Sequence, residues 1–341
     1  MPQTNEQFKN APGSEYPEPG EEAIIAEMIA EMELQLTHLY KKTKMLRQVH
    51  TKMHGCVKAS FIVLPDLSPE LKVGVFKEAM TYPAWIRFSN ANTHMHADKK
   101  KDIRGIAIKL MNVPGEKLLN DPDFEQTQDF LLMSSETFFS KNIEQFRHTL
   151  KAVTSKNKLK MAGYFLNPMH LGLVKRLFRS NIYCDHSFKI PYWSTQPFRY
   201  GSETSAVKYF LKPSADNKLI IDNTSHDNYL RMNMAKTLEV NEIHFDFYVQ
   251  FQTNPDTMPI EDPTIAWTSP FIKIADIKIL PQVFDTPAQM EFGENLSFDI
   301  WHSLPEHRPL GNFNRARKKA YEQLSKFRHE HNHLPVLEPT V

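Results

Sequence analysis

The stretch Arg47–Gly55, RQVHTKMHG, which leads into the strand-like run CVKASFIVL (56–64), decides how the chain is interpreted. It brings two histidines, two cationic side chains and a threonine together just before the chain enters a sheet or barrel. Histidine titrates near neutral pH, so a histidine at the edge of a buried cavity can transfer protons. The spacing alone leaves a second interpretation open, in which His50 is a solvated histidine in a basic loop.

His50 and His54 also have the i, i+4 spacing at which two imidazoles on a helix can bind zinc. No glutamate lies between them, however, and Gly55 follows the second histidine directly. No carboxylate or cysteine pair nearby completes a ligand set. A zinc site is therefore the less favoured alternative.

Four segments, in order along the chain, resemble the haem-binding segments of the catalase superfamily. The first two are Arg47-x-x-His50-x-Lys52 before a strand and Arg87-Phe88-Ser89. The third, DIRGIA at 102–107, is similar to the family's Asp-Pro-Arg-Gly-Phe-Ala, and the fourth is Arg317-x-x-x-Tyr321 with Arg328 seven residues beyond. The resemblance is strongest to the short catalase-related haem proteins, which share HGC after the distal histidine and an LPEHRPLG-like run.

The resemblance implies a haem b cofactor whose iron is bound by Tyr321. A phenol titrates near pH 10, so a cation must help to keep it ionised, and Arg317 lies four residues earlier on the same helix face. The resemblance places Arg47, Arg87 and Arg328 at the haem propionates or in their vicinity, and a guanidinium suits this role because it meets a carboxylate with two hydrogen bonds. Each arginine taken alone could instead form a surface salt bridge.

On the distal side, the resemblance gives His50 the role of proton carrier between the two oxygens of the peroxide. Ser89 would orient the imidazole through its other ring nitrogen and so fix its tautomer. Phe146 falls where the family has an aromatic ring over the haem edge. The catalytic residues are thus expected to be His50, Ser89 and Arg317.

The stretch 133–139, MSSETFF, departs from the family pattern. Catalases have an asparagine beside the distal histidine, in an Asn-x-x-Pro-x-Phe-Phe run; here that position is Met133 or, with a slip of one residue, Ser134. We expect the lost amide to weaken hydrogen peroxide disproportionation more than peroxidase chemistry. Allene oxide synthases have a threonine directly before the distal histidine, and this chain has Val49 there, as catalases have a valine. This difference argues against allene oxide formation.

Composition is that of an ordinary globular protein: 341 residues, 41% hydrophobic and 24% charged, with a formal net charge of +1. The charge gives no reason to propose nucleic acid or an anionic membrane as the main partner. Two cysteines, Cys56 and Cys184, indicate no disulfide framework. With no signal peptide visible and no apolar run of about 18 residues, we expect a cytoplasmic location and no membrane span.

Hydrophobic periodicity predicts the following elements. Helices are expected from Glu21 to about Met45, across 141–178 and over 312–330, with the first expected to make a packing or dimer contact. Strands are expected at 57–64, 84–89, 104–112, 129–134, 205–212, 239–253 and 271–279. From Ile243 to Phe251 apolar and polar residues alternate most regularly.

Sequential strands with aromatic faces and flanking helices predict an α+β fold built on an antiparallel β-barrel. The resemblance implies the same fold, with about eight strands and without the C-terminal flavodoxin-like domain of large catalases. We expect a flexible N-terminal arm over 1–20, one catalase-like domain over 21–341, and at most a homodimer.

Three functions follow from the resemblance. The leading one is a haem peroxidase that reduces hydrogen peroxide or organic hydroperoxides with an external electron donor and has weak catalase activity. The second is a fatty-acid hydroperoxide isomerase or lyase, and the third a non-catalytic haem-binding module. Retention of His50, Ser89 and Arg317 argues against the third.

Overall fold

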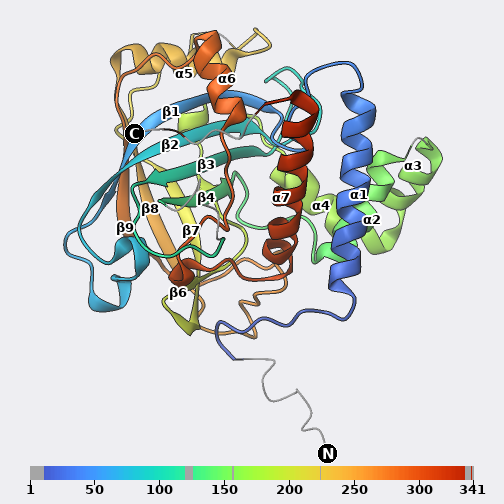
Figure 1. Cartoon of the computed structure of the whole chain (residues 1–341), viewed down its shortest axis with the longest axis horizontal. Coiled ribbons are helices and arrows are strands. Elements are labelled where there is room, and N and C mark those ends of the chain that lie inside the picture. Colours follow the sequence, from blue (N-terminus) through green and yellow to red (C-terminus); the bar gives the residue numbers. More distant parts are fainter. Residues whose placement is uncertain (1–10, 120–125, 156, 223, 335–338, 340–341) are drawn as a thin grey trace, which may run out of the picture.

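Eight antiparallel strands close into a barrel in the computed structural model, which describes residues 11–119, 126–155, 157–222, 224–334 and 339 (Figure 1). The barrel closes because β5 pairs with both β4 and β7, and β6 adds an outer strand on β7. The strands are β1 Lys52–Val63, β2 Thr81–Asn90, β3 Arg104–Met111, β4 Thr127–Met133, β5 Tyr192–Trp193, β6 Phe198–Tyr200, β7 Ser202–Pro213, β8 Ile243–Phe251 and β9 Phe271–Ile279.

Aromatic side chains fill the barrel. Phe247 stacks edge to face on Phe61 and Phe130, with ring centroids 5.1 and 5.2 Å apart. It is fully buried, as are Ile243 and Val249 on the same face of β8, because alternate residues of a strand point to one side. These side chains pack the interior of the barrel around Phe247.

The described residues form seven helices outside the barrel, and in Figure 1 α1, α2 and α7 form a layer beside it. They are α1 Glu21–Leu39, α2 Ile143–Thr154, α3 Lys158–Leu166, α4 Leu171–Ser180, α5 Tyr229–Val240, α6 Pro287–Asn295 and α7 Asn312–Asn332. Short 3-10 turns occupy Pro69–Leu71, Gly74–Phe76, Pro168–His170, Ser187–Lys189 and Pro305–His307. In the described part of the chain no helix is long and apolar enough to cross a membrane.

The predicted α+β barrel is confirmed, and three boundaries are corrected. The first helix ends at Leu39 rather than near Met45, because the backbone of Met45 exchanges its hydrogen bonds with the side chain of Asn332 instead of continuing the helix. The first strand begins at Lys52, before the predicted residue 57. The region 239–253 begins as the end of α5, and its strand starts at Ile243.

Residues 1–10 of the predicted arm lie outside the described residues. Beyond them, Gly13 donates its N–H to Gln252 and Tyr16 donates its N–H to Glu261. Glu15 forms ion pairs with Arg308 and Arg315, both at 2.7 Å. Residues 13–16 are thus tied to the segment between β8 and β9, to the segment that leads into α7 and to its first turn.

Candidate functional site

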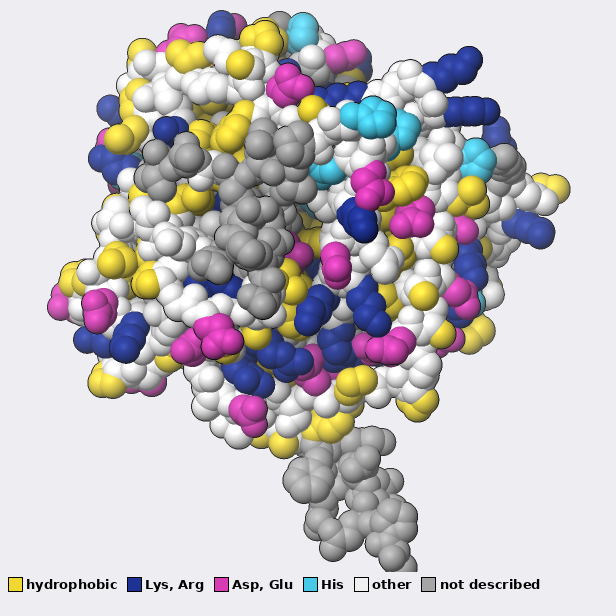
Figure 2. Space-filling model, viewed as in Figure 1, with side chains coloured by type: hydrophobic (Ala, Val, Ile, Leu, Met, Phe, Trp, Pro, Cys, Tyr) yellow, Lys and Arg dark blue, Asp and Glu magenta, His cyan; other side chains and the backbone are white. Residues whose placement is uncertain are grey.

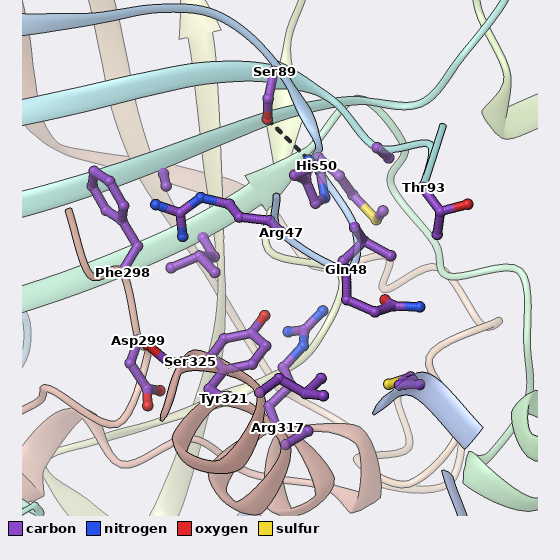
Figure 3. A pocket seen from close by; sticks show the side chains of 18 of the residues that line it. Arg47, Gln48, His50, Ser89, Thr93, Phe298, Asp299, Arg317, Tyr321 and Ser325 are labelled. Carbon is purple, nitrogen blue, oxygen red and sulfur yellow. Dashed lines mark hydrogen bonds between the residues drawn. The ribbon is translucent and has the colours of Figure 1, made fainter. Parts of the chain in front are cut away.

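A cavity of about 1390 Å³ lies between the end of the barrel and the helices α1, α2 and α7 (Figure 3). The cavity is larger than most small-molecule and cofactor pockets, which measure about 300–1,000 Å³. Strand pairing brings the barrel side of the wall together: Lys52 opposes Asn90, Asn90 opposes Arg104, and Gly105 opposes Met133. The segment before β1 and the ends of three further strands therefore meet at one rim.

His50 is fixed from several directions. Its backbone takes the left-handed conformation, with φ 58°, and its N–H donates to the carbonyl of Ala91. Its carbonyl accepts a hydrogen bond from Arg87 Nη2 at 2.9 Å. Its ring Nδ1 lies 3.0 Å from Ser89 Oγ, and the ring packs on the backbone of Gly105. The unusual backbone turns the imidazole into the cavity.

The electrostatic surroundings keep the His50 imidazole neutral. Burial lowers its pKa to about 3, and the nearby Arg87, Arg317 and Arg47 add to the effect. Both desolvation and neighbouring positive charge disfavour an imidazolium. Over the physiological pH range His50 is therefore neutral, and one of its ring nitrogens keeps a lone pair toward which a bound ligand can donate a hydrogen.

Tyr321 lies on α7 and faces the cavity from the side opposite His50, with Arg317 one turn earlier on the same helix (Figure 3). Burial raises the pKa of Tyr321, the positive charge of Arg317 lowers it, Asp299 raises it and Arg47 lowers it. The Arg317 guanidinium also donates to Asn314 Oδ1. Arg317 is thus the strongest of the neighbouring groups that favour the phenolate.

Three arginines converge on Glu294, near the C-terminal end of α6. Arg87 Nη2 lies 3.1 Å from its carboxylate, while Arg328 Nη1 and Arg47 Nε lie 3.7 and 3.8 Å away. Arg47 and Arg328 also donate to the Glu294 carbonyl, which satisfies an acceptor at the helix end. The carboxylate is the counter-charge that three buried guanidinium groups need.

This arginine cluster, Arg47, Arg87 and Arg328 around Glu294, has an excess of two positive charges. The three arginines line the cavity, whereas Glu294 lies behind them. The Nε atoms of Arg47 and Arg87 are buried without a hydrogen-bond partner. Burial lowers the pKa of Arg47, and Arg87 and Arg328 lower it further. The cluster is suited to a ligand that carries two negative charges.

A second polar group lies beside Tyr321. Asp299 lines the cavity, and burial raises its pKa to about 6. Its Oδ1 accepts from the Trp301 N–H at 2.9 Å, and its own N–H donates to Asp129. His302 Nδ1 lies 3.3 Å from the same Asp129 carboxylate. These contacts fix the loop between α6 and α7 against β4.

The side of the cavity toward the helices is apolar. Phe138 and Phe313 have ring centroids 4.7 Å apart, and Phe146 of α2 packs against both. This cluster continues onto α1 through Met28 and Met32. The cavity thus has a polar region near His50 and Tyr321 and an apolar region beneath α1 and α2.

Met133, and not Ser134, contributes to the cavity wall. Ser134 is buried, and its Oγ accepts the N–H of Arg104 at 2.8 Å. Of the two candidates for the position of the family's asparagine, Met133 and Ser134, only Met133 thus lines the cavity. Its thioether offers no hydrogen-bond donor to a ligand.

All of the residues for which the resemblance implies a role at the haem line this one cavity; they are His50, Ser89, Arg317, Arg47, Arg87, Phe146, Arg328 and Tyr321. Their roles are taken up as proposals below. The zinc alternative fails because His54 belongs to strand β1, and its ring nitrogens bond Asn90 and Ser187.

Sequence reasoning missed Glu294, Asp299 and Gly105. A counter-charge for three buried arginines could have been expected on electrostatic grounds, but no spacing pattern identifies Glu294 among 40 acidic residues. Gly105 lies within the predicted DIRGIA segment, so the segment was noticed and the reason for its glycine was not.

The barrel and its helices define a catalase-like α+β fold, and solved structures of catalases are similar to it. They include a fungal catalase (TM-score 0.66, 17% identity, 89% of this chain and 63% of that one), catalase A from Saccharomyces cerevisiae (0.64, 16%, 86% and 63%) and a bacterial catalase (0.62, 16%, 90% and 63%). The chain thus spans 63% of the length of the catalases it matches. No protein-family model and no curated protein sequence matches the chain. At such low identities the likeness establishes the fold.

Proposed function

We propose that the protein is a haem-dependent peroxidase that reduces hydrogen peroxide or organic hydroperoxides with electrons from an external one-electron donor. The observation that carries this proposal is the placement of a neutral imidazole, His50, and a phenol, Tyr321, on facing walls of one cavity. A catalase-like fold and the arginine cluster beside these two groups support it.

The residues present fit a haem. Tyr321 would bind the iron, and the excess of two positive charges in the arginine cluster equals the charge of two propionates. The three arginines line the cavity and would supply the donors for them. Phe146 and its neighbours offer an apolar wall to the porphyrin edge. When bound, the haem supplies the electrons that cleave the peroxide O–O bond and recovers them from the donor.

His50 moves the proton. In this proposal its Nδ1–H donates to Ser89 Oγ, which leaves the Nε2 lone pair free to take a proton from one oxygen of the hydroperoxide. The imidazolium then returns that proton to the leaving oxygen. Two electrons and two protons convert a hydroperoxide into an alcohol and water, or hydrogen peroxide into two waters.

Arg317 favours the ionised form of Tyr321. Burial raises the pKa of the phenol by more than Arg317 lowers it, so the phenolate would also need the positive charge of a bound iron. Arg317 acts on the phenol from one turn away on α7. The three catalytic roles are thus divided among His50, Ser89 and Arg317, with Tyr321 as the ligand.

Weak hydrogen peroxide disproportionation follows from Met133. Disproportionation requires a second hydrogen peroxide to be bound and oxidised, and a donor near His50 helps to position both of its oxygens. The thioether of Met133 provides no such donor. An external donor therefore competes well for the oxidised enzyme.

One observation favours a second candidate, a fatty-acid hydroperoxide isomerase or lyase. The apolar region beneath α1 and α2 adjoins the polar region, as a long acyl chain would need. The product distinguishes the two reactions: the peroxidase consumes one electron donor per electron and yields an alcohol, whereas the isomerase consumes none.

The test is reconstitution with haem followed by stopped-flow mixing with hydrogen peroxide and with a fatty-acid hydroperoxide. We expect a high-spin ferric spectrum with a tyrosinate band, and donor oxidation on addition of peroxide. Tyr321→Phe should lose the tyrosinate band and bind haem weakly, whereas Tyr183→Phe, on an exposed tyrosine, should behave as the wild type. Normal haem affinity and an unchanged spectrum in Tyr321→Phe would exclude the ligand assignment.

A further inference from the structure

Charge is distributed very unevenly along this chain. Residues 145–184 contain eight lysines and arginines and no aspartate or glutamate, although the whole chain has a net charge of only +1. This segment forms most of α2, all of α3 and α4, and the 3-10 turn Pro168–His170. The overall net charge does not reveal such a local positive field, because negative charges elsewhere in the chain cancel it.

Large apolar side chains are exposed on the same segment. None of the nine residues of α3 is buried. The exposed fractions are 84% for Leu159, 79% for Leu166, 87% for Met169, 61% for Leu171 and 77% for Phe178. With Lys158, Lys160, Lys175 and Arg179, which are also exposed, we call these residues the α3–α4 surface. Such a run of exposed apolar side chains indicates a binding surface.

The cations of the α3–α4 surface are not neutralised by the protein. Among the described residues, Lys158, Lys160, Lys175 and Arg179 form no ion pair, whereas Arg147 and Lys151 of α2 are both paired with Glu27 of α1. Figure 2 shows hydrophobic and basic side chains side by side at the edge of the molecule where Figure 1 places α3. The surface therefore offers apolar groups and free positive charge together.

The cavity reaches these helices. Val153 of α2, Phe165 of α3 and Leu177 of α4 line it. Each is apolar, and Phe165 and Leu177 directly precede Leu166 and Phe178 of the α3–α4 surface. A molecule held at that surface would thus lie next to an apolar part of the cavity wall.

We propose that the α3–α4 surface binds the surface of an anionic lipid bilayer and that the substrate is a hydroperoxide of a membrane lipid, which enters the cavity between α2, α3 and α4. The identity of the substrate rests on the proposed function, whereas the binding to lipid does not. An interfacial site of this type combines shallowly inserted apolar side chains with lysines and arginines that contact anionic headgroups.

The composition favours lipid over a protein partner. Lysine is depleted in protein–protein interfaces, and aromatic anchors are enriched there. The α3–α4 surface has three lysines, while Phe178 is its one aromatic residue. Its aliphatic side chains are spaced between lysines, a combination that suits the headgroup region of a lipid bilayer.

The binding test uses the haem-free full-length chain and sedimentation with vesicles of phosphatidylcholine containing phosphatidylserine. We expect binding that is lost at high salt and is weak with phosphatidylcholine alone. Each lysine or arginine near such a surface contributes about fivefold to affinity, so Lys175→Glu with Arg179→Glu should lose at least about 25-fold. Leu166→Ser, Met169→Ser and Phe178→Ser combined should lose about tenfold or more.

The matched controls alter equally exposed residues elsewhere. Val240→Ser with Val283→Ser removes apolar side chains that are 68% and 64% exposed, and Lys41→Glu with Lys42→Glu reverses two exposed charges after α1. Both should bind vesicles like the wild type. Equal losses in the controls, no vesicle binding by the wild type, or a concentration-dependent dimer that the triple variant abolishes would each overturn the proposal.

A second measurement separates this proposal from the proposed function. The haem-loaded triple variant should consume hydrogen peroxide at the wild-type rate, because Leu166, Met169 and Phe178 do not line the cavity. It should consume a phospholipid hydroperoxide in anionic vesicles at least about tenfold more slowly, in line with its lost binding. Equal rates on vesicles would overturn the substrate assignment even if vesicle binding and peroxidase activity both hold.

Discussion

The imidazole of His50 lies directly against the backbone of Gly105. A β-carbon on Gly105 would stand 2.2 Å from Cε1 and 2.3 Å from Nδ1 of that ring, far inside contact distance. In β3, Gly105 pairs with Ser89 of β2 and with Met133 of β4. The glycine therefore allows the imidazole to lie against the backbone of β3, and the contact with Ser89 Oγ fixes the rotation of the ring.

Gly105→Ala should displace the His50 ring and lengthen its contact with Ser89 Oγ. Since a misplacement of about 1 Å in a reacting group costs on the order of 100-fold, we expect the rate of reaction with hydrogen peroxide to fall about 100-fold with haem affinity retained. Stopped-flow mixing of the haem-loaded protein measures it. Gly163→Ala, where a β-carbon meets nothing within 4 Å, is the control, and a wild-type rate in Gly105→Ala would contradict the placement of His50.

Met133→Asn should bring a hydrogen-bond donor to the cavity wall on the strand next to Gly105. A well-placed donor contributes about 100-fold or more to a polar transition state. We expect oxygen release from hydrogen peroxide to rise at least about tenfold relative to donor oxidation, as read with an oxygen electrode. Met133→Leu keeps the site apolar and should not change the ratio. No gain with the asparagine would mean that Met133 does not limit disproportionation.

The long strands of the barrel could be predicted because their signals are local, whereas the two-residue strand β5, which closes the barrel, was not predicted. Strand β9 was placed at its observed bounds, 271–279, and the regular alternation over Ile243–Phe251 marks a strand with one buried face. Boundaries failed where tertiary contacts override periodicity. The helix that ends at Leu39 instead of Met45 does so because Asn332, 287 residues away, binds the Met45 backbone.

The site shows the same division. His50, Ser89, Arg317 and Tyr321 were recognised from short motifs because each motif keeps its spacing along a strand or helix. Glu294 could not be recognised from a motif, because its role as a counter-charge arises only where three arginines from distant segments meet. The α3–α4 surface was missed for another reason: its excess charge cancels in the total of +1.

Glu294→Gln should destabilise the haem-free protein more than the haem-bound one. Removing one partner of a buried ion pair costs roughly 3–5 kcal/mol, and here three guanidinium groups lose their carboxylate. Bound propionates would restore negative charge, so haem should recover much of the lost unfolding free energy. Haem dimethyl ester should not recover it, because its esterified propionates are uncharged.

Denaturant titrations with and without haem measure this difference. Glu291→Gln on the same helix removes only an exposed pair with Lys44 and should change the unfolding free energy by less than about 1 kcal/mol. An equal loss for Glu294→Gln in both forms would mean that the arginine cluster does not face the propionates.

Stability should fall as pH drops below about 6.5, because several histidines are buried in the neutral form. His307 is fully buried, and its Nε2 accepts the N–H of Val75. Burial lowers its pKa to about 3, and burial also lowers the pKa of His186 to about 4. In the unfolded chain these histidines bind protons below about pH 6.5, whereas in the folded protein they stay neutral down to their lowered pKa. Unfolding therefore takes up protons between these two pH values, and the free energy of unfolding falls as pH falls. For His307 alone the loss at pH 5 is about 2 kcal/mol.

His307→Gln keeps an acceptor for the Val75 N–H and removes the titrating group. The slope of unfolding free energy against pH between 4.5 and 6 should therefore decrease by about one proton, or about 1.4 kcal/mol per pH unit. Urea titrations at several pH values give this slope. His38→Gln, on the exposed side of α1, should leave it unchanged. Because the slope counts protons and not contacts, a general loss of stability in His307→Gln cannot imitate the effect, and an unchanged slope would show that His307 is protonated in the folded protein.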